Sequence, residues 1–236
     1  MTDTDPHRPP PAPVGTDAAA VQRMYDRRFP EQDRARKAAI WQVVVEHGLQ
    51  KWVPHGATVL DVGCGYGEFL NHVRCARRIG VDMNPDSAAA LDRGVEFHPG
   101  DVRDLSFLGD GSVDVVFTSN LLEHLPSKAE VERLLREAHR VLRPGGHLIA
   151  LGPNARIVPG AYWDFWDHHV PITDRSLVEV LETLGFRTVD CIGQWLPYTT
   201  RSSLPQAPWL VRLYLRLPFL WRGLGSQFLV RVQKPA

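Results

Sequence analysis

Between residues 57 and 151 the chain alternates short apolar runs, many of them β-branched, with longer stretches of helical periodicity. Successive side chains of a strand point to opposite faces, whereas side chains on one helix face recur every three to four residues. The pattern predicts strands over residues 57–62, 77–82, 95–98, 113–118 and 146–151. Strands that alternate with helices form a mostly parallel sheet with helices on both faces, so we expect an α/β fold.

Two helices are predicted in the second half of the chain. The first covers residues 127–142 and carries one apolar stripe, and the Pro144-Gly145-Gly146 sequence predicts a turn that ends it. The second begins after Thr173, which is a good N-cap residue, and ends at Gly185. We expect the last two strands over residues 186–195 and 227–232.

The rest of the chain divides by composition. Residues 1–17 are rich in proline and poor in large apolar side chains, so we expect a disordered tail. Residues 18–236 are predicted to form a single domain. Its parts are an N-terminal helical cap over 18–56, a core over 57–195 and a helical insertion over 196–225 before the last strand.

Composition limits the classes of function. The 236 residues are 44% hydrophobic, which is enough for one domain with an ordinary core. Lys+Arg and Asp+Glu are both 27, so no excess of positive charge indicates a nucleic-acid partner. The three cysteines have no C-x-x-C spacing, as expected of reduced thiols, and the N-terminus lacks the apolar core of a signal peptide. We therefore expect a cytoplasmic protein.

The most informative motif follows the first predicted strand, where Asp61 is followed by Gly63, Gly65 and Gly67 and a helix is expected next. Glycines permit tight turns and let a ligand lie against the backbone at a helix N-terminus. A dinucleotide fingerprint would need its third glycine at Glu68, so the turn closes early. At the end of the second predicted strand an acid, Asp82, stands where it can accept hydrogen bonds from ribose hydroxyls.

This strand and glycine turn resemble the first motif of the class I S-adenosylmethionine-dependent methyltransferases. Four further segments resemble the family in the same order: residues 97–102, 112–120, 122–126 and 140–150. The resemblance covers roughly residues 57 to 192. It implies a Rossmann-like sheet of seven strands, mostly parallel, in which an antiparallel seventh strand lies between the fifth and the sixth.

The resemblance also implies S-adenosyl-L-methionine as cofactor and a set of residues that contact it: Asp61, Gly63, Gly65, Gly67, Asp82, Met83, Asp101, Val102 and Asn120. The Asp101 carboxylate would meet the adenine amino group and the Val102 amide a ring nitrogen. Asn120 would lie nearest the methyl group. A turn or N-cap acid is the alternative interpretation of Asp101.

The N-terminal helices would fold over the cofactor in this family, with Tyr25, Arg36 or Trp41 within reach. The alternative is that they only cover an edge of the sheet.

Residues 153–171 exceed what the bare fold needs, and their aromatic cluster suits a lid at the carboxyl edge of the sheet. If the acceptor is a hydroxyl, a base helps, and His124, His168 and His169 are the candidate catalytic residues because imidazole titrates near neutral pH. Packing or capping of a loop is the alternative for His124, and a packed, hydrogen-bonded side chain is the alternative for His169.

A metal site also comes into consideration in the same segment, from Asp164, Asp167, His168 and His169. Adjacent histidines in an extended or turn segment diverge, however, and no further spacing supports zinc. We therefore expect no metal.

Residues 209–217 are almost wholly apolar apart from Arg212 and Arg216, which share one helix face. The segment is open to three interpretations, namely a roof over the substrate, a homodimer surface or a helix that lies on a membrane surface. Pro208 and Pro218 interrupt it too early for a transmembrane span.

The predicted function is transfer of a methyl group from S-adenosylmethionine to an oxygen or nitrogen of a small-molecule acceptor. The alternative is a catalytically silent protein that binds the same cofactor and acts through a partner chain held by residues 204–222. An NAD-linked oxidoreductase is a further rival, which the early closure of the glycine turn opposes.

Overall fold

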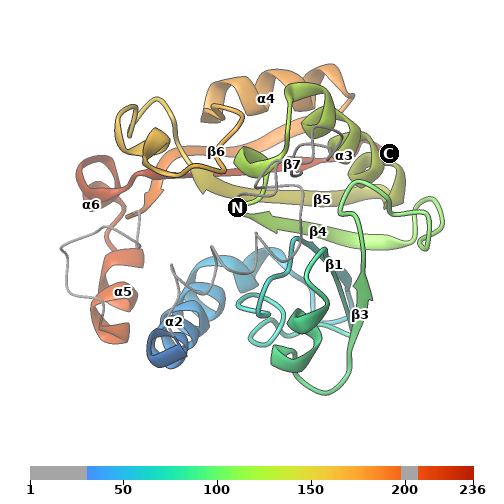
Figure 1. Cartoon of the computed structure of the whole chain (residues 1–236), viewed down its shortest axis with the longest axis horizontal. Coiled ribbons are helices and arrows are strands. Elements are labelled where there is room, and N and C mark those ends of the chain that lie inside the picture. Colours follow the sequence, from blue (N-terminus) through green and yellow to red (C-terminus); the bar gives the residue numbers. More distant parts are fainter. Residues whose placement is uncertain (1–30, 198–206) are drawn as a thin grey trace, which may run out of the picture.

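A computed structural model describes residues 31–197 and 207–236 of the chain. Its centre is a seven-stranded sheet in the order β3-β2-β1-β4-β5-β7-β6 (Figure 1). The strands are β1 (Thr58–Val62), β2 (Arg77–Asp82), β3 (Val95–Pro99), β4 (Val113–Ser119), β5 (Leu142–Pro153), β6 (Arg187–Leu196) and β7 (Gln227–Gln233). Strand β7 runs antiparallel to both β5 and β6, while the other neighbouring pairs are parallel. This confirms the predicted fold class and the predicted place of the last strand.

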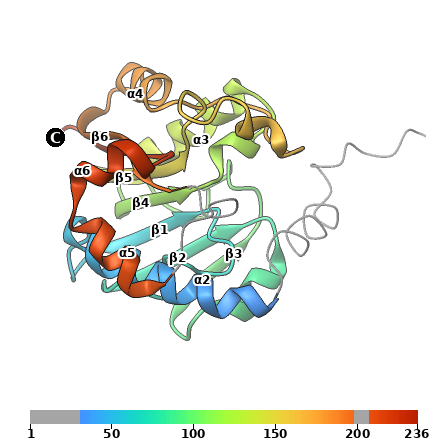
Figure 2. The same ribbon diagram turned by 90° about the vertical axis from the view of Figure 1, so that its left-hand side faces the viewer.

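Helices cover both faces of the sheet (Figure 2). One face carries α3 (Lys128–Val141) and α4 (Asp174–Thr183), and the other carries α2 (Glu31–Val44) and α5 (Pro208–Leu215). A π-helical turn (Val45–Leu49) and a 3₁₀ turn (Gln50–Trp52) continue α2, and α6 (Pro218–Leu224) lies against β6. Because side chains alternate along a strand, Leu60 packs into the core on one face and its neighbour Val59 into the core on the other.

Local signals in the sequence explain where α3 begins and where α4 begins and ends. The Ser127 side chain accepts a hydrogen bond from the Glu130 N–H at the start of α3. Thr173 caps α4 by accepting from the Ser176 N–H, and the Ser176 hydroxyl in turn accepts from the Thr173 N–H. Gly185 follows the helix with φ +92°, a left-handed conformation that glycine adopts without strain. Both predicted helices are confirmed.

The helix expected directly after the glycine turn is wrong. Residues 63–72 form a series of turns, in which the Asn71 N–H donates to the Gly67 carbonyl but the His72 N–H donates to that of Phe69. This mixture of spacings does not build a regular helix. After β2 there is likewise only a short 3₁₀ helix, η3 (Pro85–Ala90). The helices that cover the sheet therefore come from the segment before β1, which forms α2, and from the connections after β4, which form α3 to α6.

The predicted Pro144-Gly145-Gly146 turn is also wrong, because these residues belong to β5. Val113 pairs with Leu142 but Val115 pairs with His147, so the extra residues of β5 form a bulge. The Gly145 N–H donates to the Lys234 carbonyl, and the Lys234 N–H donates to that of Gly146. The chain after β7 thus holds the bulge in the sheet, which no local pattern in the sequence reports.

Several expectations concern the two ends of the chain. The predicted tail over 1–17 and Tyr25 lie outside the described residues. Arg36 is exposed, and Trp41 packs edge-on against Phe117 with ring centroids 6.4 Å apart, so this tryptophan covers the sheet.

The helices α5 and α6 leave several large apolar side chains exposed, among them those of Trp209, Leu213 and Phe219. In the described part of the chain no helix is both long and apolar enough to cross a membrane. The roof, dimer and membrane-surface interpretations of this segment stay predictions.

The cap of α4 gives a first test. Thr173→Ala removes the side-chain acceptor and should lower the free energy of unfolding by about 0.5 to 2 kcal/mol, measured by urea denaturation. Thr183→Ala, at the exposed end of the same helix, is the matched control and should change it by less than about 0.5 kcal/mol. Equal losses in the two variants would mean that the cap does not stabilise the helix.

Candidate functional site

The glycine loop after β1 has an unusual backbone. Gly63, Gly65 and Gly67 have φ of +75°, +50° and +80°, a region where side chains with a Cβ are strained. The N–H groups of Gly63 and Cys64 both donate to the carbonyl of Val81 in β2, at 2.9 and 3.2 Å. The loop is therefore fastened to the neighbouring strand before it turns.

The three glycines differ in their surroundings. A Cβ at Gly67 would lie 2.6 Å from the end of the Leu91 side chain, so both the local packing and the positive φ favour glycine there. A Cβ at Gly65 would meet nothing closer than the Glu68 carboxylate at 3.5 Å. The backbone at Gly65 is therefore open, as it must be where a ligand lies against it.

Three carboxylates surround this loop. Burial raises the pKa of Asp61, and the charges of Glu68 and Asp82 raise it further. Burial also raises the pKa of Asp82, although its carboxylate accepts hydrogen bonds from the N–H groups of Asn84, at 2.9 Å, and Gly65, at 2.8 Å. Lys37 on α2 pairs with Glu68 at 2.5 Å. Because these acids oppose one another's ionisation, a ligand with a positive charge fits the loop better than an anion.

The other predicted contacts to the cofactor, Met83, Asp101 and Val102, differ in their exposure. Met83 follows Asp82 and is 44% exposed, whereas Val102 is buried in the core. The Asp101 carboxylate accepts from the Arg103 backbone N–H and pairs with its guanidinium, which holds the pKa of Asp101 below its usual range. In this structure Asp101 therefore acts as a turn acid, as the alternative interpretation proposed. Its carboxylate is still partly exposed to solvent.

Asn120 stands just beyond β4 and is the one non-glycine residue with positive φ, +51°, among the residues that the structure describes. Its N–H donates to the Leu151 carbonyl, and its side-chain oxygen accepts from Gln227 at 3.3 Å. Such strained backbone persists only where neighbours hold it in place, and it concentrates at functional sites.

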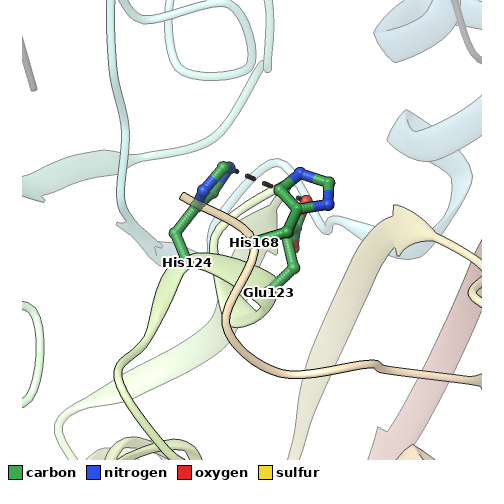
Figure 3. Close-up of side chains that lie close together, drawn as sticks. All are labelled: Glu123, His124 and His168. Carbon is green, nitrogen blue, oxygen red and sulfur yellow. Dashed lines mark ion pairs between the residues drawn. The ribbon is translucent and has the colours of Figure 1, made fainter. Parts of the chain in front are cut away.

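A compact group of polar side chains follows Asn120. The short helix η4 (Leu122–His124) supplies Glu123 and His124, and the segment after η5 (Ala161–Asp164) supplies Asp167 and His168. Figure 3 shows the Glu123, His124 and His168 side chains pointing toward one another. The ring centroids of His124 and His168 are 4.9 Å apart, and His124 Nδ1 lies 3.1 Å from an Asp167 carboxylate oxygen. We call Glu123, His124, Asp167 and His168 the histidine cluster.

Burial and charge shift the pKa values of this cluster. Burial raises the pKa of Glu123, and the charge of His124 only partly offsets this. Burial opposes a charge on His124, but the hydrogen bond to Asp167 and the charges of Glu123 and Asp167 outweigh it and raise its pKa. The cluster therefore favours a positive charge on His124, beside the carboxyl groups of Glu123 and Asp167.

His169 does not join the cluster. Its side chain is exposed, and only its backbone N–H contacts the site by donating to the Glu123 carbonyl at 2.8 Å. The packed interpretation of His169 is wrong for its side chain and instead describes the buried His168. Glu123 is the member that the sequence did not single out, and its position between two leucines and a histidine was the available signal.

The lid segment is tied to the same place. The buried Tyr162 hydroxyl donates to the Val170 carbonyl at 2.5 Å and accepts from the Ile172 N–H at 3.1 Å. These bonds fix the path of the chain on both sides of Asp167 and His168.

A hollow of about 450 Å³ lies at the opposite edge of the sheet, where β1, β4 and β5 begin, and is lined by Trp52, Asp114 and Arg143 among others. Asp114 is already engaged there with Arg143 and with the Thr58 N–H. Open α/β sheets bind ligands beyond the carboxyl ends of their strands, so we place the candidate site at the glycine loop and Asn120.

Comparisons with known proteins show which proteins this chain is similar to. Residues 60–150 match a family described as a methyltransferase domain. A Mycolicibacterium smegmatis protein named as a probable S-adenosylmethionine-dependent methyltransferase is 36% identical over 146 residues, which are 58% of this chain and 55% of the relative. The 2-methyl-6-phytyl-1,4-hydroquinone methyltransferase of Synechocystis is 29% identical over 198 residues, 75% of this chain and 59% of the relative. The chain thus spans less than two thirds of the length of both relatives.

Solved structures share the fold. A SAM-dependent methyltransferase from Archaeoglobus fulgidus superposes with a TM-score of 0.63 at 20% identity, over 90% of this chain and 99% of that one. Residues 60–150 thus match a methyltransferase domain, and the chain is similar in sequence to proteins named as S-adenosylmethionine-dependent methyltransferases and shares the fold of such an enzyme.

Proposed function

We propose that the protein transfers a methyl group from S-adenosylmethionine to an oxygen or nitrogen of a small-molecule acceptor. The observation that carries the proposal is the glycine loop, open at Gly65 and surrounded by Asp61, Glu68 and Asp82. When bound, the cofactor supplies a methyl group that its sulfonium already activates. A sulfonium cation fits beside carboxylates, whereas the pyrophosphate of NAD would be repelled, so the same observation disfavours the oxidoreductase rival.

The proposed contacts to the cofactor follow from the strand ends. Gly63, Gly65 and Gly67 would allow the close approach, and the Asp82 carboxylate has lone pairs left to accept from ribose hydroxyls. Around the adenine we place Met83, Asp101 and Val102, and next to the methyl group we place Asn120. The strained Asn120 backbone supports that role.

On the acceptor side, the main task is to hold a nucleophilic atom about 3 to 3.5 Å from the methyl carbon and to exclude water. The lid segment would exclude water, because Tyr162 holds its chain together and Asp167 binds it to His124 after β4. The histidine cluster would accept the acceptor's proton, since it groups titratable side chains around η4, the short helix that follows Asn120 in the chain. The small-molecule class is supported by the hydroquinone named for one relative.

The arrangement of the chain into cap, core and insertion belongs to the same proposal. The cap interpretation of residues 18–56 is supported by the pair between Lys37 and Glu68 and by the Arg34 guanidinium, which lies 4.4 Å from the Tyr66 ring centre. Both contacts bring α2 to the glycine loop. A catalytically silent cofactor-binding protein stays the alternative, and it predicts cofactor binding without turnover.

Binding and turnover together test the proposal. Calorimetry should show binding of S-adenosylmethionine and its demethylated product but not of NAD. Incubation with labelled cofactor and a cell extract should then give a labelled small molecule, found by mass spectrometry. Binding without any labelled product would favour the silent alternative.

The ribose contact gives a second prediction. Asp82→Ala should weaken cofactor binding by roughly 1 to 3 kcal/mol, the range for losing hydrogen bonds to a charged group. Asp86→Ala removes an exposed carboxylate four residues further on and should leave the affinity unchanged. Cofactor affinity is measured by calorimetry on the folded variants. If Asp82→Ala binds the cofactor as tightly as the wild-type protein, Asp82 does not contact the ribose.

The open backbone at Gly65 gives a third prediction. Gly65→Ala should abolish cofactor binding, because the new methyl group occupies space that the ligand needs. The matched control is Gly94→Ala, which places the same strain on a positive-φ glycine before β3, at the other edge of the sheet. Both variants should lose similar stability, about 1 to 2 kcal/mol, but only Gly65→Ala should lose binding. Loss of binding in both would point to general destabilisation.

The histidines give a fourth prediction. His124→Ala and His168→Ala should keep cofactor affinity while turnover falls by about 10²- to 10⁴-fold, the usual contribution of acid-base catalysis. His169→Ala should lose much less, because that side chain lies outside the cluster. Calorimetry and steady-state kinetics on the three variants separate these outcomes. Equal, modest losses in all three would leave proximity and exclusion of water as the mechanism.

A further inference from the structure

We propose that Glu123, His124 and His168 bind one divalent first-row transition-metal ion, which holds an oxygen of the acceptor. The role of the ion rests on the proposed methyl transfer, but its binding does not. The observation behind the proposal is that each residue offers one ligand atom and that the three atoms all lie within 4.8 Å of one another (Figure 3).

The tautomer of His124 favours coordination. Its Nδ1 lies 3.0 Å from the Asp167 backbone carbonyl and 3.1 Å from the Asp167 carboxylate. A carbonyl and a carboxylate both accept hydrogen bonds, so Nδ1 carries the proton. In the neutral ring the lone pair is then on Nε2. A carboxylate or carbonyl behind a histidine orients metal-binding histidines in the same way.

The distance between the facing atoms also suits an ion. His124 Nε2 is 4.0 Å from Glu123 Oε1, which is too long for a hydrogen bond. Ligand atoms lie about 2.0 to 2.2 Å from a bound metal, so two ligands of one ion are separated by roughly 3 to 4 Å. Movements of the side chains by about 1 Å would bring all three atoms to such distances.

Charge balance is the third argument. The Glu123 side chain is only 3% exposed, and in the described part of the chain no lysine or arginine pairs with it. A second carboxyl group, that of Asp167, is 11% exposed and acts on the same site. Asp167 already pairs with His124, so Glu123 is the carboxylate that a divalent cation would pair with, since buried carboxylates are normally paired or bound to metal.

The donor set indicates the kind of ion. Two imidazoles and one carboxylate suit zinc, iron, cobalt or manganese, whereas magnesium and calcium prefer oxygen ligands alone. Three protein ligands leave coordination positions open. Glu123 follows Asn120 by three residues, and we place the acceptor at an open position of the ion. An acceptor hydroxyl bound there would have a lowered pKa and would release its proton to water, so that with the ion bound the two histidines act through the metal and not as free bases.

The sequence led to the opposite expectation, since adjacent histidines diverge. The structure agrees about the divergence, because His169 points to solvent while His168 is buried. The second imidazole comes instead from His124 on η4, which the fold brings against the lid segment.

Metal binding is measured directly on the full chain. After treatment with a chelator and removal of the chelator, the protein is titrated with Co²⁺, and visible d–d absorption is followed. We expect one ion per chain, displacement by Zn²⁺ and none by equimolar Mg²⁺. Zn²⁺ should also raise the melting temperature of the wild-type protein, a readout that needs no variant.

Variants locate the site. Glu123→Gln and His168→Gln keep the size of the side chains and should lower the affinity by more than the roughly 10- to 100-fold typical of losing an outer hydrogen-bond partner. Asp167→Asn changes such an outer partner, so its loss of metal affinity should lie within that 10- to 100-fold range. His55→Ala removes an exposed histidine and is the control for adventitious surface binding.

Two outcomes overturn the proposal: no Co²⁺ spectrum and no stabilisation by Zn²⁺ in the wild-type protein, or binding that neither Glu123→Gln nor His168→Gln weakens. Calorimetry with S-adenosylmethionine on the same samples separates this failure from that of the proposed function. Cofactor binding without metal binding rejects only the ion, whereas metal binding without cofactor binding rejects only the methyltransferase assignment of the site.

Discussion

The contact on which the site depends is the one between the glycine loop and the end of β2. Parallel pairing sets Asp61 opposite Gly80 and Val62 opposite Val81, so Asp82 lies just beyond the paired region. From there its carboxylate accepts the Gly65 N–H, and the Val81 carbonyl accepts two more N–H groups of the loop. The register requires a glycine opposite the loop, since a Cβ at Gly80 would lie 2.9 Å from the Cys64 sulfur. Burial in that contact also raises the pKa of the Cys64 thiol, which fits a packing role.

The order of the strands brings the other half of the site to this loop. Strand β1 is flanked by β2 and β4, so the chain leaves the centre of the sheet in one direction after β1 and returns on its other side with β4. Val62 pairs with Thr118, and the loop after β1 therefore emerges beside Asn120. Ligands of open α/β sheets bind at such switch points. Cofactor contacts and acceptor contacts can thus come from segments about 60 residues apart because the topology places two strand ends side by side.

The sequence predicted those parts of the structure whose signals are local. A cap at Thr173 and a glycine at Gly185 bound α4, and strands β1 and β4 lie where the apolar, β-branched runs predicted them. The errors arose where distant residues decide the conformation. Lys234 holds the Pro144-Gly145-Gly146 segment as a bulge, and Asn71 binds the carbonyl of Ala90 and the N–H of Asp92 across the turns that replace the expected helix.

The histidine cluster shows the same limit in the site itself. Each histidine was visible in the sequence as a candidate, but the partner of His124 is Asp167, on a segment that the sequence connects to it only through the fold. The contact has two consequences at once. It fixes which nitrogen of His124 carries the proton, and it fastens residues 153–171 to the segment that follows β4. A charge-assisted hydrogen bond of this kind contributes roughly 1.5 to 3 kcal/mol. Any ligand that changes the charge on His124 therefore also changes how firmly Asp167 and its neighbours are held, so the charge of His124 and the position of residues 153–171 are coupled through one side chain.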